Sequence, residues 1–183
     1  MLRALIGDLW CEVERLGLPV AAHRNPGVSV DYLERAFGQR VPSEIATWFG
    51  CFNGVTYYPG QTQNDAALVP GYEPLSVDES AAVRGDYPQE ALLPSCSFPL
   101  LGTGGGDFYV ASYDFDTGHS HVVSVMAGEE PRIAYNSVEQ MVKTLIRCYR
   151  EGIFFVDDTG VLQADDDRWI QLEVEASGHT SGE

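Results

Sequence analysis

The sequence predicts one α+β domain in which a twisted antiparallel sheet is flanked by helices. Apolar residues recur at helical spacing near both ends of the chain, and the middle contains alternating segments on either side of a turn signal. Strands and helices do not alternate in the way that builds a doubly wound parallel sheet. Because 183 residues suffice for one ordinary domain, we expect residues 1–175 to form it and residues 176–183 to be a flexible tail.

Two amphipathic helices are expected in the N-terminal part of this domain. The first is "LRALIGDLWCEVERL", whose leucine, isoleucine and valine residues share one face, and Gly17 and Pro19 end it. The second is "VDYLERAF", where Ser29 is placed to cap the start and Gly38 to stop the end. Both helices should pack on the core through their apolar faces.

A third helix is predicted in "VPSEIATWFGCFNG". Ser43 is the candidate N-terminal cap, and Asn53 with Gly54 offers the left-handed positions that close a helix. The apolar face at helical spacing indicates core packing rather than a ligand site. That face consists of Ile45, Trp48, Phe49 and Phe52.

The segment from Val55 to about Pro99 is rich in turn residues and predicts strand ends and a long loop before a short helix. Regular alternation returns in "DFYVASYDFD", which predicts a strand, and "HVVSVMA" predicts its partner. The intervening "DTGHS" is typical of a hairpin turn, so we expect the two strands to pair antiparallel.

The clearest helix signal is "NSVEQMVKTLIRCYREG". Ser137 and Gln140 have the spacing of a capping box, and Gly152 is the expected stop. The next segment, "IFFVDDTGVLQAD", predicts a short hairpin, and "DDDRWIQLEVEASG" predicts a last helix that leads into the tail.

Four glycines among residues 102–106 raise the question of a phosphate-binding loop. A dinucleotide fingerprint or a Walker loop requires a helix after the glycines, whereas this sequence predicts a strand. Asp107 directly after the glycines would also repel a phosphate. We therefore expect Gly104 to Gly106 to form a tight turn with positive φ angles that starts the strand.

One arrangement could hold a metal ion. His119 and His121 are two residues apart and so share a face of a strand, with Asp114 or Asp116 placed across the hairpin turn. A third fixed ligand is missing from the pattern, and a solvated acidic hairpin tip is the favoured interpretation. We expect no metal and no cofactor.

Other chemical motifs are weaker still. The acidic runs 157–158 and 165–167 lack the spacing of a calcium-binding loop. Cys96 is a lone thiol in a loop, and no nucleophile elbow is present. The four cysteines contain no CxxC pair and are expected to be reduced and mostly buried. The sequence thus argues against an enzyme.

The net charge of the chain limits which classes of partner are expected. Twenty-seven acidic and eleven basic residues give a formal charge of −16, which disfavours nucleic acid and anionic membranes and favours a basic partner. No secretory or membrane-spanning segment is apparent, so we expect a soluble, cytoplasmic protein of undetermined oligomeric state. Tyr57, Tyr58, Tyr72 and Tyr87 lie in loop-rich sequence, where tyrosines suit a protein interface, although half of them could instead cover the core. The candidate partner contacts are Tyr57, Tyr58, Tyr72, Asp114, Asp116, Asp157 and Asp158.

Three segments in order resemble the SUKH superfamily, also called the Smi-Knr family. "VPSEIATWFGCFNGV" resembles its "LP…W…NG" helix, "LLGTGGGDFYVASYD" resembles its "G…GGGD" motif, and "SVEQMVKTLIRCYREGIFFVDDTG" is similar to its closing helix. The loop "YYPGQTQNDAALVPGY" fits a "GY…L" stretch between them, and the set covers residues 41–160. The motif positions are Pro42, Trp48, Asn53, Gly54, Gly105, Gly106 and Asp107.

The resemblance implies a binding domain without a catalytic centre. Bacterial members are typically immunity proteins that block a toxin, so we expect a cognate, basic toxin such as a nuclease as the partner. Fungal relatives regulate cell-wall synthesis through protein contacts, so a regulator or scaffold is the alternative, and a metal-dependent enzyme is less favoured. The motif residues are expected to determine the fold, with Asp107 bonding local amides of the turn it ends.

Overall fold

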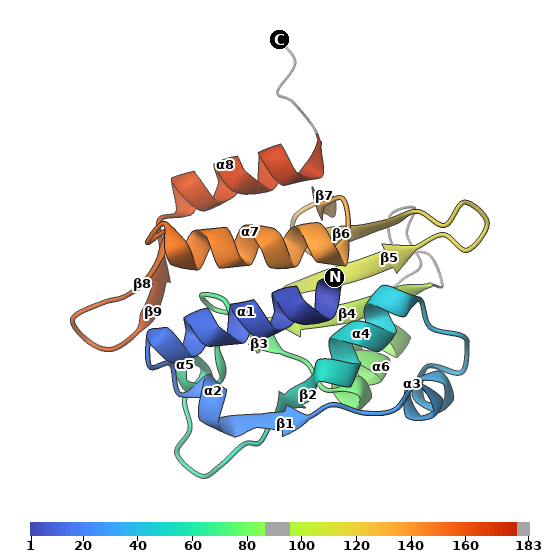
Figure 1. The fold of residues 1–183 in the computed structure, drawn as a ribbon, viewed down its shortest axis with the longest axis horizontal. Coiled ribbons are helices and arrows are strands. Elements are labelled where there is room, and N and C mark those ends of the chain that lie inside the picture. Colours follow the sequence, from blue (N-terminus) through green and yellow to red (C-terminus); the bar gives the residue numbers. More distant parts are fainter. Residues whose placement is uncertain (87–95, 179–183) are drawn as a thin grey trace.

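The computed structural model describes residues 1–86 and 96–178 and has the α+β architecture that the sequence predicts (Figure 1). The helices are α1 (Leu2–Arg15), α2 (Val20–His23), α3 (Val30–Phe37), α4 (Ser43–Cys51), α5 (Gln63–Ala66), α6 (Val77–Asp86), α7 (Val138–Arg150) and α8 (Asp166–Ser177). The strands are β1 (Arg24–Pro26), β2 (Phe52–Val55), β3 (Glu73–Pro74), β4 (Ser97–Gly102), β5 (Phe108–Tyr113), β6 (Ser120–Val125), β7 (Arg132–Tyr135), β8 (Phe154–Val156) and β9 (Leu162–Ala164).

The main sheet is antiparallel, with the strand order β3-β4-β5-β6-β7. β5 and β6 pair in register from Phe108 opposite Val125, which confirms the predicted hairpin. Successive residues of a strand point to opposite faces, so Tyr109 joins the large core while Val110 packs with Val123 on the other face. β1 with β2, and β8 with β9, form two further antiparallel pairs.

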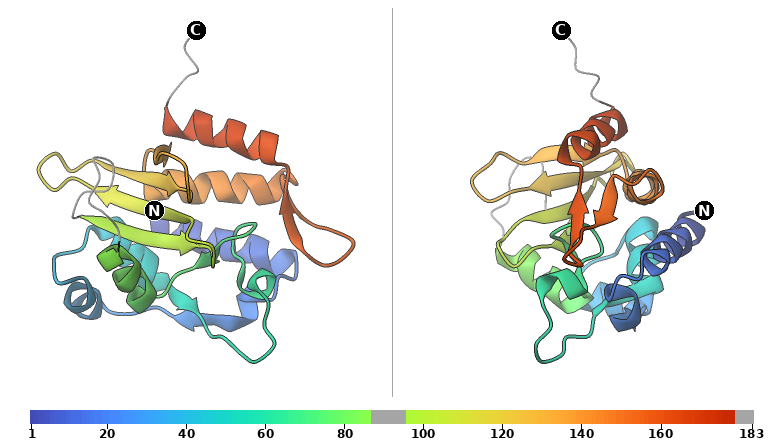
Figure 2. Two further views of the ribbon diagram at one scale, coloured as in Figure 1. Left: turned by 180° about the vertical axis from the view of Figure 1, so that it is seen from behind. Right: turned by 90° about the vertical axis from the view of Figure 1, so that its left-hand side faces the viewer.

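Helices α1, α7 and α8 lie side by side against one face of the main sheet (Figures 1 and 2). α7 is the middle helix of the three, and its apolar face is buried, as Met141 and Leu145 illustrate. The aromatic residues predicted for the core are buried. Trp48 is fully buried, and the centre of its ring lies 4.8 Å from that of Phe52. The helical periodicity therefore identifies the buried faces correctly.

Several predicted helix ends are confirmed. The Ser29 hydroxyl accepts the amide hydrogen of Tyr32 at 3.3 Å, and the Ser137 hydroxyl accepts that of Gln140 at 3.0 Å. Gly38 closes α3 in a left-handed conformation with φ of 67°. These local signals act within one turn of the chain, which is why the sequence alone reveals them.

The predictions for α4 need correction at both ends. Pro42 occupies the cap position, and Ser43 is already helical, with its carbonyl accepting the Thr47 hydroxyl at 2.7 Å. The helix ends at Cys51, and the following four residues form β2 instead of a helix cap. Pairing with β1, in which Arg24 lies opposite Val55, draws this segment into an extended conformation. The left-handed position within it is Gly54, with φ of 63°.

Two further expectations are revised. α8 continues through Ser177 and closes at Gly178, so its last two residues lie within the segment predicted as a tail, while residues 179–183 and Tyr87 lie outside the described residues. Cys148 is buried, but Cys51 and Cys96 are half-buried and the remaining cysteine is exposed, so the expectation that most are buried is wrong.

In the described ranges, every helix is too short or too polar to cross a lipid bilayer.

Candidate protein-docking surface

The glycine-rich turn before β5 is a structural turn. The Thr103 amide donates to the Asp107 carbonyl at 2.9 Å, and the Thr103 hydroxyl accepts from the amides of Gly105 and Asp107. Of the three glycines expected at positive φ, Gly106 has one, at 97°. The prediction that the Asp107 carboxylate bonds the amides of its own turn is wrong, because this carboxylate accepts the amide of Ala127 at 2.8 Å instead. The amides of Thr103, Gly105 and Asp107 thus have partners within the turn.

Asn53 and Gly54 lie in β2 and contact the start of α6. The Asn53 side-chain oxygen accepts the Val77 amide at 2.8 Å, which satisfies a free donor at the start of α6. Gly54 lies so close to Ser76 that a Cβ atom on it would be 2.7 Å from the Ser76 nitrogen. Together with Pro42 at the start of α4, these positions serve backbone geometry rather than an exposed site.

The tyrosines proposed as partner contacts divide into two groups. Tyr57 and Tyr58 follow β2 in a loop, and 51% and 39% of their surfaces are exposed. Tyr72, in contrast, is 7% exposed, and its ring packs on that of Tyr109 at 4.9 Å. The structure therefore removes Tyr72 from the candidate contacts and assigns it to the core.

The Tyr57 hydroxyl contacts two carboxylates. This hydroxyl is 2.9 Å from Glu73 Oε2 and 3.3 Å from Glu79 Oε1, so one phenolic hydrogen faces two acceptors. Burial raises the pKa of Glu73, the Tyr57 hydrogen bond opposes that rise, and the charge of Glu79 adds to it. A cation brought to this point would be attracted by both carboxylates.

The neighbouring residues fix this arrangement. Glu79 caps α6 by accepting the amide of Ser76 at 2.7 Å, and the Tyr58 ring packs on the ring of His23 at 4.6 Å. Asp78, next to Glu79, accepts the hydroxyl of Tyr32 at 2.8 Å. We call this set the tyrosine–carboxylate surface, and it consists of Tyr57, Tyr58, Glu73, Asp78 and Glu79.

The β8–β9 hairpin is attached next to this loop region. Asn64 of α5 donates to the Gly160 carbonyl at 3.2 Å and accepts the Leu162 amide at 2.8 Å. The hairpin projects from the helical layer at the same end of the molecule as α2 and α5 (Figures 1 and 2). Phe155 and Val156 on β8 are 43% and 38% exposed, so the hairpin adds apolar area at this end.

Asp157 is a structural residue of this hairpin rather than an available contact. One carboxylate oxygen accepts the Thr159 amide at 2.8 Å and the Val161 amide at 3.0 Å, and the other accepts the Gln163 side chain at 3.0 Å. These hydrogen bonds, with that of the Thr159 hydroxyl, hold the pKa of Asp157 well below its usual range. Asp158 beside it is exposed and remains a candidate contact.

We expect Asp157→Ala to loosen the hairpin and Asp158→Ala to leave it unchanged. Because the folded-state pKa of Asp157 is depressed, its contribution is present above the unfolded-state value and is lost as the pH falls below about 4. Amide protection factors at Thr159 and Val161, measured by NMR, should fall in Asp157→Ala and in the unchanged protein at low pH. Equal protection in the two variants would contradict this role.

Asp114 and Asp116 lie at the opposite end of the molecule, in the β5–β6 turn (Figure 1). The Asp114 carboxylate accepts the amide of Asp116 at 2.8 Å and the hydroxyl of Thr117 at 2.8 Å, which forms the turn. His119 precedes β6 and lies outside the strand, contrary to the shared face predicted for the two histidines. Across residues 1–86 and 96–178, no three His, Cys, Asp or Glu side chains gather as metal ligands.

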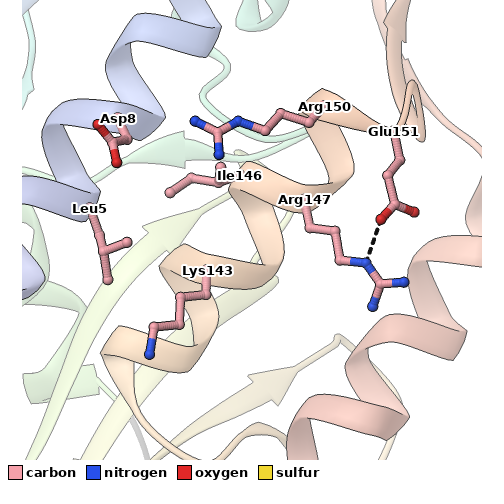
Figure 3. Close-up of a pocket in the computed structure, with 7 residues that line it drawn as sticks. All are labelled: Leu5, Asp8, Lys143, Ile146, Arg147, Arg150 and Glu151. Atoms are coloured by element: carbon pink, nitrogen blue, oxygen red, sulfur yellow. Dashed lines mark hydrogen bonds and ion pairs between the residues drawn. The ribbon is translucent and has the colours of Figure 1, made fainter.

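The groove between α1 and α7 shows where the basic residues are used (Figure 3). Arg147 points toward α8 and Arg150 toward α1, and both are ion-paired, with Glu151 at 2.5 Å and Glu12 at 2.7 Å. Lys143 pairs with Glu139 at 2.8 Å. The basic residues of this groove are thus already paired with carboxylates.

Sequence reasoning did not identify Glu73 and Glu79. Glu79 had a local signal, because Ser76 and Glu79 have the spacing of a capping box. Glu73 had none, since its meeting with Tyr57 depends on β3 lying beside β2. Comparison with known proteins adds no family assignment: the sequence matches no family model, and no curated protein matches it.

Proposed function

We propose that this chain is a non-catalytic binding domain that captures and neutralises a basic protein, as the resemblance to SUKH immunity proteins implies. The observation that carries the proposal is the half-exposed Tyr57, whose hydroxyl meets the carboxylates of Glu73 and Glu79. An aromatic body with a polar tip supplies contact area at low cost in conformational entropy. Two adjacent carboxylates supply acceptors for a lysine or arginine.

The overall charge supports the same partner. A formal charge of −16 attracts a basic protein at long range and repels nucleic acid, so the encounter with a basic partner is accelerated. A nuclease toxin has a basic nucleic-acid cleft, which an acidic protein can occupy and block. We therefore place the toxin, rather than a substrate, opposite the tyrosine–carboxylate surface.

The partner is identified by co-expression with the products of neighbouring genes. The tagged protein is purified at moderate salt, and any stoichiometric partner is identified by mass. We expect a basic toxin domain at one-to-one stoichiometry that is released as the salt concentration rises, together with relief of its toxicity. A partner that is not a toxin would favour the regulator alternative instead, and absence of any partner would count against the proposal.

Two double variants test the surface itself. Glu73→Gln/Glu79→Gln keeps the hydrogen-bond acceptors and the cap of α6 but removes two charges, and it should weaken partner binding by about tenfold or more. Asp114→Asn/Asp116→Asn removes two charges at the opposite end and should weaken binding only slightly. Calorimetric titration at fixed ionic strength measures both. Equal losses would show that the net charge matters and this surface does not.

A further inference from the structure

A second groove is lined by positive charge, whereas the chain as a whole is strongly acidic. It lies between the first half of α1, β1 and the end of α4, and its volume is about 330 Å³. Two guanidinium groups line it, those of Arg3 and Arg24, and no acidic side chain of the described ranges does. Given 27 acidic residues in the chain, a groove lined by two arginines and no carboxylate is unexpected.

The two arginines of this groove have a weak carboxylate partner or none in the described residues. Arg3 forms no ion pair with any carboxylate of residues 1–86 and 96–178. Arg24 meets Glu14 at 3.6 Å, and the side chains of both are substantially exposed, so water screens this pair. The basic residues of the α1–α7 groove, in contrast, have close carboxylate partners. The positive charge of Arg3 and Arg24 is therefore available to a ligand, whereas that of the α1–α7 groove is already neutralised.

Packing holds both arginines at the groove. The Arg24 guanidinium lies 4.9 Å from the centre of the buried Trp10 ring, a cation–π contact that orients it. The Arg3 guanidinium lies beside the end of α4, where it opposes the rise that burial causes in the pKa of the Cys51 thiol. Directly after β1 the backbone packs closely on the end of α4, since a Cβ on Gly27 would lie 2.3 Å from the Gly50 carbonyl oxygen.

We propose that this groove binds a phosphate group carried by a small molecule. Guanidinium groups match the oxygens of phosphate with paired hydrogen bonds, and two of them balance the double negative charge of a phosphate monoester. The volume is at the small end of the range for ligand sites, which suits a compact ligand. Glu14 is a near carboxylate, 3.6 Å from Arg24 and about half exposed, and a phosphate would compete with it for that guanidinium. Acidic groups farther than about 8 Å away oppose binding little, because physiological salt screens their charge.

Titration with inorganic phosphate against chloride at equal ionic strength tests the site, with backbone and arginine side-chain NMR signals as the readout. We expect saturable shifts at Arg3, Arg24 and Gly7 in phosphate and none in chloride. Acetate in a third arm distinguishes a phosphate site from a general carboxylate site. Absence of saturable shifts in phosphate, or equal affinity for acetate, would overturn the proposal.

Three variants distinguish phosphate binding in the groove from non-specific attraction by surface charge. Arg3→Gln/Arg24→Gln should weaken phosphate binding by about tenfold or more, whereas Arg35→Gln, an exposed arginine on α3, should not. Gly7→Leu keeps every charge but fills the groove, since a Cβ at Gly7 meets no atom within 4 Å, and it should block binding. Undiminished binding in Gly7→Leu, or an equal loss in Arg35→Gln, would place the phosphate elsewhere.

Discussion

Replacing Glu173 with alanine is expected to lower the free energy of unfolding by about 3 kcal/mol. The side chain is 2% exposed, and its carboxylate accepts the hydroxyls of Tyr109 at 2.6 Å and Tyr135 at 2.7 Å while pairing with Arg132 at 2.5 Å. Alanine leaves two buried phenols without their acceptor, and each unsatisfied donor costs roughly 1–3 kcal/mol. Arg132 is 42% exposed and regains water, which limits the loss. Urea unfolding measures the difference.

Glu175→Ala is the matched control on the same helix. Glu175 meets Arg147 at 3.2 Å, and about half of each side chain is exposed, so its loss should leave the unfolding free energy nearly unchanged. Hydrogen exchange of the α8 amides should accelerate in Glu173→Ala and not in the control. Similar stability of the two variants would refute the idea that Glu173 holds α8 on the sheet.

Glu173→Gln separates the charge from the shape. The amide keeps an acceptor for one phenol but turns a donor toward the other groups, so we expect a loss between those of the alanine variant and the control. Trp169 reports on the same contact, because its indole nitrogen donates to the Tyr135 hydroxyl at 3.3 Å. Its near-ultraviolet circular dichroism should change in proportion to the lost stability.

Elements determined by local pattern could be predicted from the sequence. α1 and α7 show helical periodicity, and their end signals act within a few residues, as the Ser137 cap of α7 illustrates. The β5–β6 and β8–β9 hairpins join neighbouring segments through short turns, so their pairing needs no distant information. The Asp157 turn shows the same principle, because every partner of its carboxylate lies within six residues.

Elements that depend on distant contacts could not be predicted. All six residues of β4 are buried, so they show no alternation, and Pro99 within the strand argued against one. β2 is extended because β1, almost thirty residues earlier, pairs with it, whereas its own sequence continues the helical pattern of α4. Local propensity was overridden there by tertiary pairing.

The sequence predicted the tyrosines of the candidate docking surface but not its glutamates. Tyr57 and Tyr58 lie in a turn-rich loop, and exposure follows from that context. Tyr72 lies in similar sequence but is covered by Tyr109, a contact that only the sheet creates. Glu73 comes to Tyr57 from 16 residues away, and no spacing rule links them. Composition therefore indicates which residue types bind, while topology decides which of them meet.

Gly54→Ala is expected to destabilise the protein by about 3 kcal/mol, through two separate costs. The backbone at Gly54 has φ of 63°, which is unfavourable for any residue with a Cβ. The added Cβ would also lie 2.7 Å from the Ser76 nitrogen, closer than such atoms approach in proteins. Ser76 begins the capping box of α6 with Glu79, so relief of the clash must displace the start of that helix.

Gly38→Ala measures the backbone strain alone, without the close contact that a Cβ makes at Gly54. Gly38 has φ of 67°, almost the angle of Gly54, but a Cβ there meets no atom within 4 Å, so only the backbone strain of about 1 kcal/mol applies. The excess loss in Gly54→Ala therefore measures the close contact between β2 and α6. Because Glu79 lies in the first turn of α6, the same variant should also weaken partner binding, while Gly38→Ala should not. Equal destabilisation by the two substitutions would mean that α6 yields without cost, and the position of Glu79 would then not depend on Gly54.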